Sequence, residues 1–318
     1  MSKYLITGGA GFIGSNLSNQ LSEEHEVVIV DDLSMGKVSN IAMTDNVTFI
    51  EGSVTDSDLM TSLLKEHAFD YIYHLAAIAS VADSVERPLE THEVNFSSVL
   101  HLLDTVRDTQ PGLKRLVFAS SAAVYGDELT LPKKEESVIR PLTPYAIDKF
   151  ASEKYVLAYH HLYGIPTAAV RFFNVYGPNQ NPQSPYSGVI SIMVDRFEQA
   201  VSGQDAHFTL FGDGEQSRDF VYVEDVVQAL LLVGTKEEAL GEVFNVGTGN
   251  QTTLNQLLDS LSDLSETTVP VKREETRAGD IKDSYADISK LQGIGYDAHH
   301  TVKEGLKKYL TSIDFFSK

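Results

Sequence analysis

Short apolar runs alternate with helical patterns of apolar residues along the first half of the chain. One run covers residues 4–6 and another covers 27–30, and between them apolar residues recur from Phe12 to Leu21 at the spacing of a helix face. Strands that alternate with helices assemble into a parallel sheet. The pattern therefore predicts an α/β fold with a doubly wound parallel sheet. Its further predicted strands cover 47–50, 71–75, 115–119 and 166–173, and its further predicted helices cover 57–67, 90–108 and 145–163.

A glycine-rich turn joins the first predicted strand to the first predicted helix. Gly8, Gly11 and Gly14 are spaced so that the turn can be sharp and the backbone can approach a pyrophosphate. The helix that follows, beginning near Phe12 and Ile13, attracts phosphates through its free backbone amides. A tight turn without a ligand is the alternative, but the order of strand, glycines, helix and second strand favours a dinucleotide site of the Rossmann type.

Two acids close the second predicted strand. Asp31 and Asp32 follow the apolar run at 27–30. An acid at this place hydrogen-bonds the adenosine ribose of a dinucleotide and repels a 2′-phosphate. The sequence therefore predicts NAD as the cofactor and disfavours NADP.

The character of the chain changes after Asn174. Residues 178–188 are rich in proline and asparagine and predict an irregular crossing into a second part of the molecule. We expect an NAD-binding Rossmann domain over residues 1–173 and a smaller α/β substrate-binding lobe over residues 174–318. Segments near 217–246 can return to the first domain.

The composition of the chain disfavours several classes of partner and site. The chain of 318 residues carries a formal net charge of −20, which opposes binding to a nucleic-acid backbone. Cysteine is absent, so disulfides and thiolate metal sites are excluded; no metal site is predicted, and His74 is expected to be packed or hydrogen-bonded. No apolar run reaches the roughly 18 residues that span a membrane. We expect a cytoplasmic protein that binds neither nucleic acid nor a membrane.

Three residues form a candidate acid/base site beside the predicted dinucleotide. Tyr145 and Lys149 are four positions apart at the start of a predicted helix, so they share one face. A free phenol has a pKa of about 10, and a nearby ammonium and a cationic nicotinamide both favour the phenolate. Ser121, just after the predicted strand at 115–119, can hydrogen-bond the same substrate oxygen. Such a site exchanges a proton with the substrate beside a hydride acceptor.

These motifs and others downstream resemble, in sequence and in order, the motifs of the extended short-chain dehydrogenase/reductase family. Within that family they most resemble the nucleotide-sugar 4-epimerases. The resemblance covers nearly the whole chain, so it is more specific than any single motif. It rests on the segments 7–14, 120–126, 144–149, 171–178, 218–221 and 277–280.

The resemblance implies a reaction without net oxidation. A tightly held NAD removes the hydride from C4 of a UDP-sugar while Tyr145 takes the O4 proton. The 4-keto sugar then turns and receives the hydride on its other face. The resemblance also implies a homodimer, formed through helices near 90–108 and 145–163.

The family's functional residues can be carried over by motif position. Ser121, Tyr145 and Lys149 are the implied catalytic residues, and guanidinium groups at Arg218 and Arg277 suit the oxygens of a diphosphate. The implied NAD-binding residues are Gly8, Gly11, Phe12, Ile13, Gly14, Asp31, Asp32, Ser53, Val54, Leu75, Ala76, Ala77, Tyr145, Lys149 and Phe172. The implied UDP-sugar residues are Ser121, Ala122, Tyr145, Asn174, Gly188, Val189, Arg218, Arg277, Asp280 and Ser284.

Alternatives within and outside the family are less favoured. Related dehydratases and decarboxylases place an acid within two positions after the serine, where this chain has Ala122 and Ala123. A UDP-glucuronate 4-epimerase is expected to offer a cation soon after position 178, where this chain has Asn179. An NAD-sensing regulator has no need of the serine, tyrosine and lysine together, and it is the least favoured alternative.

Ser284 bears on the choice of sugar. It stands four positions beyond Asp280, where in the family a tyrosine restricts the pocket to glucose and galactose and a small residue admits an N-acetyl group. A larger pocket need not exclude plain hexoses. We therefore expect either activity on both pairs or a preference for UDP-GlcNAc/UDP-GalNAc. Ala79 and Ser53 replace a lysine and an acid of better-known galactose epimerases, so NAD retention is expected to be weaker.

Overall fold

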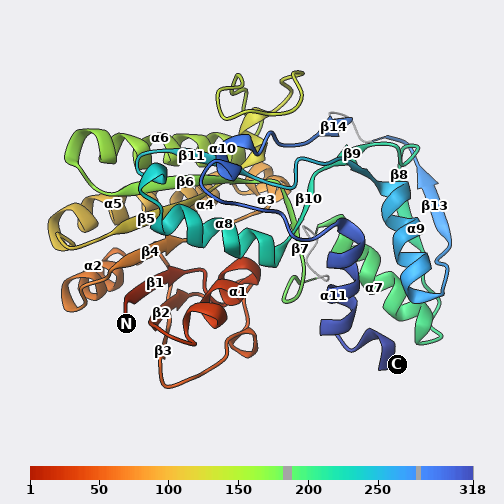
Figure 1. Ribbon diagram of the computed structural model, residues 1–318, viewed down its shortest axis with the longest axis horizontal. Helices are drawn as coiled ribbons and strands as arrows, with labels where there is room; N and C mark the ends of the chain where they lie inside the picture. Colours follow the sequence, from red (N-terminus) through yellow and green to blue (C-terminus); the bar gives the residue numbers. More distant parts are fainter. Residues whose placement is uncertain (182–187, 277–280, 318) are drawn as a thin grey trace.

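The structure is a computed structural model and describes residues 1–181, 188–276 and 281–317. Within these residues, seven parallel strands form a central sheet in the order β11-β6-β5-β4-β1-β2-β3 (Figure 1). The order runs outward in both directions from β1, as in doubly wound sheets. The strands are β1 (Lys3–Thr7), β2 (Glu26–Asp31), β3 (Val47–Glu51), β4 (Tyr71–His74), β5 (Arg115–Ser121), β6 (Thr167–Phe172) and β11 (Val243–Val246).

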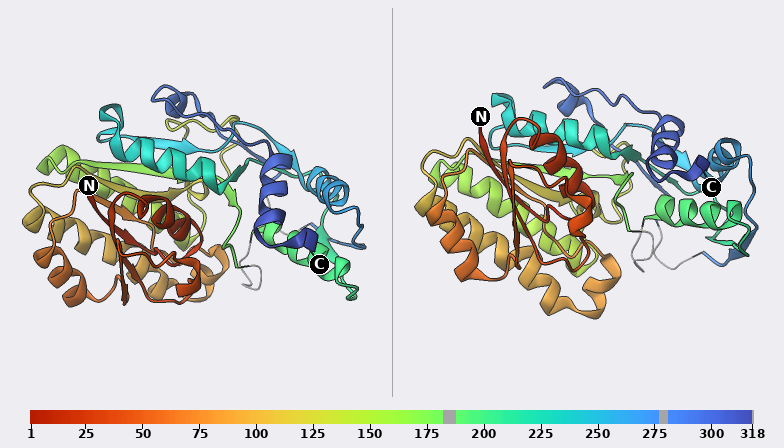
Figure 2. Two further views of the ribbon diagram at one scale, coloured as in Figure 1. Left: turned by 60° about the horizontal axis from the view of Figure 1, so that its bottom comes forward. Right: turned by 90° about the horizontal axis from the view of Figure 1, so that it is seen from below.

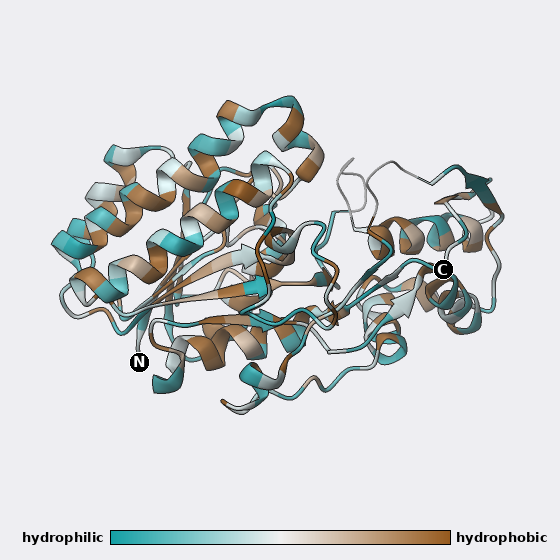
Figure 3. Cartoon of the chain, turned by 90° about the horizontal axis from the view of Figure 1, so that it is seen from above, coloured by the Kyte–Doolittle hydropathy of each residue, from teal (hydrophilic) through white to brown (hydrophobic). Residues whose placement is uncertain are grey.

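Helices cover both faces of this sheet (Figure 2). Successive strand residues point to opposite faces, so Leu5 and Ile6 belong to two separate hydrophobic cores. Ile6 shares its core with Leu17 and Leu230, whereas Leu5 shares its core with Leu63 and Leu102. Figure 3 shows the alternation of apolar and polar positions along these helices. They are α1 (Phe12–Leu21) and α8 (Val223–Thr235) on one face and α2 (Ser57–Glu66), α5 (Ser98–Thr109) and α6 (Pro144–Tyr163) on the other.

A smaller group of elements has a core of its own beyond the carboxyl ends of the strands (Figure 1). β6 ends at Phe172 and β7 begins at Asn174, so the chain passes from the sheet directly toward this group. The group contains α7 (Val189–Val201), β8 (Phe208–Phe211), α9 (Leu254–Ser265), β13 (Val271–Glu274) and α11 (Val302–Ser312). Short strands lie beside it: β7 (Asn174–Tyr176) pairs with β10 (Phe220–Tyr222), and β9 (Ser217–Arg218) pairs with β12 (Thr252–Thr253) and β14 (Asp283–Ser284).

The two groups are interleaved in the sequence. After β10 the chain returns to the main sheet, because α8 packs on β5 and β6 and β11 pairs with β6. The sheet is therefore completed by residues from beyond position 220. α10 (Ser289–Gln292) also packs against β11.

The helix predicted at 90–108 is interrupted by a π-helical turn. α3 (Val81–Glu86) and α4 (Pro88–His92) come first, the π turn covers Glu93–Ser97, and α5 follows. The turn contains buried Asn95, whose side chain accepts a hydrogen bond from N of Ile78 (2.9 Å) and donates one to O of Ile78 (3.0 Å). Such wider turns occur frequently at functional sites. Here the turn anchors the segment that follows β4.

Among residues 1–181, 188–276 and 281–317, no helix combines the length and apolar composition that a membrane crossing requires. The same residues hold no group of three or more His, Asp or Glu side chains placed to bind a metal ion.

Candidate active site

The glycine turn after β1 leaves no room for side chains. Gly8 has a φ of +70°, and a Cβ there would lie 2.7 Å from N of Ala76, in the segment after β4. A Cβ at Gly14 would lie 2.1 Å from the carbonyl oxygen of Gly8. Gly11 caps α1 without a side-chain hydrogen bond, so the first amides of the helix remain available to an anion. This cradle fits the pyrophosphate of a dinucleotide.

Asp31, at the end of β2, braces the same turn. Its Oδ2 accepts a hydrogen bond from N of Ala10 (2.9 Å) and its Oδ1 accepts one from N of Leu33 (2.8 Å). Burial raises the pKa of this carboxyl, and the backbone hydrogen bonds oppose that rise. An ionised carboxylate has further lone pairs, so it can still accept from a ribose hydroxyl. Asp32 is exposed, and its Oδ1 accepts from N of Ser34 (3.0 Å).

The other predicted cofactor residues also follow strand ends. Ser53 and Val54 come after β3, the segment 75–77 comes after β4, and Phe172 is the last residue of β6. Parallel strands end at one edge of a sheet, so these residues share that edge with the glycine turn. The sheet therefore assembles residues that are more than 160 positions apart in the sequence.

The three predicted catalytic residues come from two adjacent elements. Ser121 is the last residue of β5, while Tyr145 and Lys149 lie in the first turns of α6. α6 begins here because Thr143 caps it, accepting from N of Ala146 (3.3 Å), and Pro144 occupies its first turn. Ser121 hydrogen-bonds the Tyr145 phenol. Nζ of Lys149 donates to the carbonyl oxygen of Ala119 (2.9 Å).

Burial dominates the protonation of this site. It raises the pKa of the Tyr145 phenol, against the effect of the hydrogen bond with Ser121. It lowers the pKa of the Lys149 ammonium to about 7, against the effect of Asp148. In the protein chain alone the Tyr145 phenol is therefore protonated, because desolvation of a buried phenolate outweighs the hydrogen bond. The combined effect of the ammonium and a bound cationic nicotinamide stays a prediction.

His74 packs as predicted. It is buried at the end of β4, and its Nδ1 lies 2.9 Å from Oγ1 of Thr7. Burial, and then the charge of Lys149, lowers its pKa to about 3. His74 is therefore neutral at physiological pH.

A buried ion pair that the sequence did not indicate supports α6. Arg171 of β6 forms two hydrogen bonds with Glu153 of α6, at 2.9 and 2.6 Å, and both side chains are almost completely buried. Ser120 also donates to Glu153 (2.8 Å). The pair ties the helix that carries Tyr145 and Lys149 to both neighbouring strands. No local spacing signals this pair, because it joins a helix to a strand 18 positions further along the chain.

The predicted substrate residues fall in several places. Ala122 begins a short 3₁₀ turn after β5, and Asn174 is exposed at the start of β7. Gly188 caps α7 and Val189 begins it. Arg277 and Asp280 lie outside the described residues.

Arg218 and Ser284 are brought together by the pairing of β9 with β14. They are direct partners in the parallel register. Nη1 of Arg218 donates to the carbonyl oxygens of Ser217 (2.8 Å) and Lys282 (3.0 Å). The buried carboxylate of Asp219 accepts from N of Ala286 (3.2 Å), which fixes β14 beside β9.

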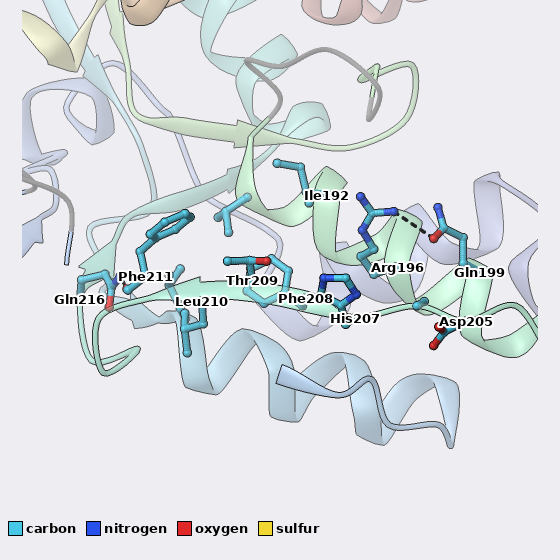
Figure 4. A pocket seen from close by; sticks show the side chains of 13 residues that line it. Ile192, Arg196, Gln199, Asp205, His207, Phe208, Thr209, Leu210, Phe211 and Gln216 are labelled. Carbon is cyan, nitrogen blue, oxygen red and sulfur yellow. Dashed lines mark hydrogen bonds between the residues drawn. The ribbon is translucent and has the colours of Figure 1, made fainter. Parts of the chain in front are cut away.

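A cavity of about 560 Å³ lies between α7 and β8 (Figure 4). Val189, a predicted substrate residue, lines it, whereas the predicted catalytic residues Ser121, Tyr145 and Lys149 do not. Sequence reasoning missed the rest of its lining, although the alternating pattern of residues 208–211 is typical of a strand with two different faces. Those residues include Ile192, Arg196, Ala206, Phe208, Phe211 and Gln216.

Comparison with known proteins identifies the family of this chain. Residues 4–247 match the model of the NAD dependent epimerase/dehydratase family. A putative UDP-glucose 4-epimerase of Methanocaldococcus jannaschii is 36% identical over 306 residues, which cover 96% of each protein.

Two solved structures are similar along their whole length, each with 36% identity and a TM-score of 0.91. One is a UDP-N-acetylglucosamine 4-epimerase from Methanobrevibacter ruminantium in complex with UDP-N-acetylmuramic acid, and the match covers 98% of both chains. The other is a UDP-glucose 4-epimerase from Thermotoga maritima with UDP-glucose, and the match covers 99% of this chain and 100% of that chain. The predicted fold is confirmed, and the chain belongs to the NAD dependent epimerase/dehydratase family.

Proposed function

We propose that this protein is an NAD-dependent UDP-sugar 4-epimerase. The observation that carries the proposal is the convergence of Ser121, Tyr145 and Lys149 at the end of β5, in a sheet whose first turn is a glycine cradle. The relatives named as 4-epimerases support the same reaction.

NAD fits the strand ends of the sheet. Gly8, Gly11 and Gly14 leave the backbone open to its pyrophosphate, and Asp31, the last residue of β2, is the proposed partner of its adenosine ribose. Bound NAD supplies an acceptor and donor for the hydride at C4 of the sugar.

The chain's own residues handle the proton. Tyr145 takes the O4 proton of the sugar as C4 is oxidised and returns it when C4 is reduced. Ser121 hydrogen-bonds Tyr145 and can pass the proton between the phenol and O4. The ammonium form of Lys149 stabilises the phenolate. Ala122 and Ala123 supply no acid for elimination, so the keto sugar keeps its other substituents.

The smaller group of elements offers places for the nucleotide and the sugar. The cavity between α7 and β8 has apolar walls at Ile192, Phe208 and Leu210 that suit the faces of a nucleobase. Arg218 and Arg277 are the proposed diphosphate ligands. Ser284, opposite Arg218, leaves room at C2 for an N-acetyl group. We therefore expect activity on UDP-GlcNAc and UDP-GalNAc, alone or together with the plain hexoses.

Proton NMR of the sugars tests the proposal. The purified protein is incubated separately with UDP-glucose and UDP-GlcNAc, first without and then with added NAD. Appearance of the galacto isomer from either establishes 4-epimerisation. If neither sugar converts even with NAD, the proposal fails for these substrates, and UDP-glucuronate is tested next. Loss of water from the sugar, or net NADH formation, would instead indicate a dehydratase or an oxidoreductase.

Exposed apolar side chains on α6 and α4 support a homodimer. Ile147 and Leu162 of α6 and Leu89 of α4 are large apolar residues with side chains at least half exposed. Covering such residues with the same face of a second copy would bury them. Analytical ultracentrifugation should give about twice the chain mass for the wild type and the single mass for Ile147→Glu. Leu129→Glu is the matched control, because Leu129 is also exposed but lies in a loop and not in α4 or α6.

A further inference from the structure

The residue before Lys149 carries a carboxylate that is almost completely buried. Asp148 lies in α6, and its Oδ1 is 2.8 Å from Nδ1 of His92, at the end of α4. Its other oxygen, Oδ2, has no hydrogen-bond partner among the described residues. Leaving a buried carboxylate oxygen unpaired is costly, so this arrangement calls for an explanation beyond packing.

The buried ammonium of Lys149 lacks, among the described residues, a negatively charged partner that would stabilise it. Its ammonium is buried, its hydrogen bond goes to the neutral carbonyl of Ala119, and no ion pair within the described part of the chain includes it. Burial lowers its pKa to about 7, and the charge of Asp148 acts in the opposite direction. With a pKa of about 7, a lysine readily loses its proton near neutral pH, and the neutral amine cannot stabilise a phenolate.

The other groups around Lys149 carry little net charge. His74 of β4 is neutral, and Tyr145 of α6 has a raised pKa and is also neutral. The charge of Glu153 is matched by Arg171 at 2.6 Å. His92 can donate to Asp148 from Nδ1 as a neutral ring, which leaves the charge of the carboxylate in place. Asp148 directly precedes Lys149 in α6 and is buried with it, and its negative charge is the one that opposes the effect of burial on Lys149.

We propose that Asp148, held in place by His92, is a positioning residue that keeps the buried Lys149 in its ammonium form. The proposal rests on the proposed epimerase function only for its effect on catalysis, since the charge of Lys149 can be measured without substrate. The competing explanation is that Asp148 and His92 only tie α6 to α4. That tie would affect stability but not the titration of Lys149.

Asp148→Asn separates the two explanations. The amide keeps the shape of the side chain and an oxygen that accepts from His92, and it removes the charge. The Lys149 pKa should fall, so the alkaline limb of the kcat profile for epimerisation should move to lower pH by roughly half to one unit. Glu66→Gln is the matched control, because it removes the same charge from an exposed position in α2 and should leave the limb unchanged.

NMR of the protein as purified, with ¹³C- and ¹⁵N-labelled lysine and no sugar present, measures Lys149 directly. Lys149→Met identifies the resonance by its loss. A lower titration midpoint in Asp148→Asn, and a smaller shift in the same direction in His92→Phe, are expected. An unchanged midpoint in Asp148→Asn would overturn the proposal even if the enzyme is an active epimerase, and an unchanged midpoint in His92→Phe would remove His92 from it. If no UDP-sugar is epimerised, this titration still decides the role of Asp148.

Discussion

Ser284 lies directly opposite Arg218, as its partner in the parallel pairing of β14 with β9. Arg218 belongs to a motif expected at the diphosphate, whereas Ser284 is expected beside C2 of the sugar. Paired positions of neighbouring strands present their side chains on the same face of a sheet. The pairing thus places Ser284, the candidate specificity residue, next to Arg218, a candidate ligand of the substrate diphosphate.

Enlarging Ser284 should change the choice of sugar. Ser284→Tyr fills the space next to Arg218, so the rate with UDP-GlcNAc relative to UDP-glucose should fall by about 10- to 200-fold. Initial rates from proton NMR with each sugar measure the ratio. Ser284→Ala is the control, since it leaves the space open and should keep the ratio close to that of the wild type. An unchanged ratio in Ser284→Tyr would place Ser284 away from the sugar.

Removing the phenol oxygen of Tyr145 should stop proton transfer without disturbing the fold. Tyr145→Phe should lower kcat by about 10²- to 10⁴-fold, because the sugar O4 loses its acid/base partner. The circular dichroism spectrum and the NAD content should match those of the wild type. Activity close to that of the wild type would mean that another group takes the proton.

Breaking the buried pair of Glu153 and Arg171 should destabilise the protein strongly. Glu153→Gln leaves the buried Arg171 guanidinium without its counter-charge, and the free energy of unfolding should fall by about 3–5 kcal/mol. Urea denaturation measures the change. Glu90→Gln breaks an exposed pair with Arg87 and should have a much smaller effect. Equal effects of the two substitutions would contradict the assigned role of burial.

The depressed pKa of Lys149 should make stability depend on pH. Its pKa is about 7 in the folded protein and 10.5 in the unfolded chain, so between these values the unfolded state binds more protons. The free energy of unfolding of the wild type, relative to Lys149→Met, should therefore rise as pH increases above about 7, by up to about 1 kcal/mol per pH unit. Urea denaturation between pH 7 and 9, after removal of bound nucleotide, measures the slope. Parallel pH dependences of the two proteins would mean that Lys149 keeps an ordinary pKa.

The sequence by itself determined the features that depend on short spacings. The apolar runs predicted the strands because a parallel sheet is buried on both faces, and the glycine spacing predicted a turn in which Gly8 and Gly14 have no room for a Cβ. The four-residue separation of Tyr145 and Lys149 placed them on one face of α6. These are local consequences of backbone geometry.

Only the tertiary structure decided what depends on contacts between distant segments. β11 completes the main sheet beside β6, Arg218 meets Ser284, and Arg171 pairs with Glu153 through packing that no local pattern encodes. The protonation of Lys149 was decided in the same way, because burial acts on it only after α6 has packed on β5. Desolvation is a property of the assembled core, so a list of residues along the chain does not contain it.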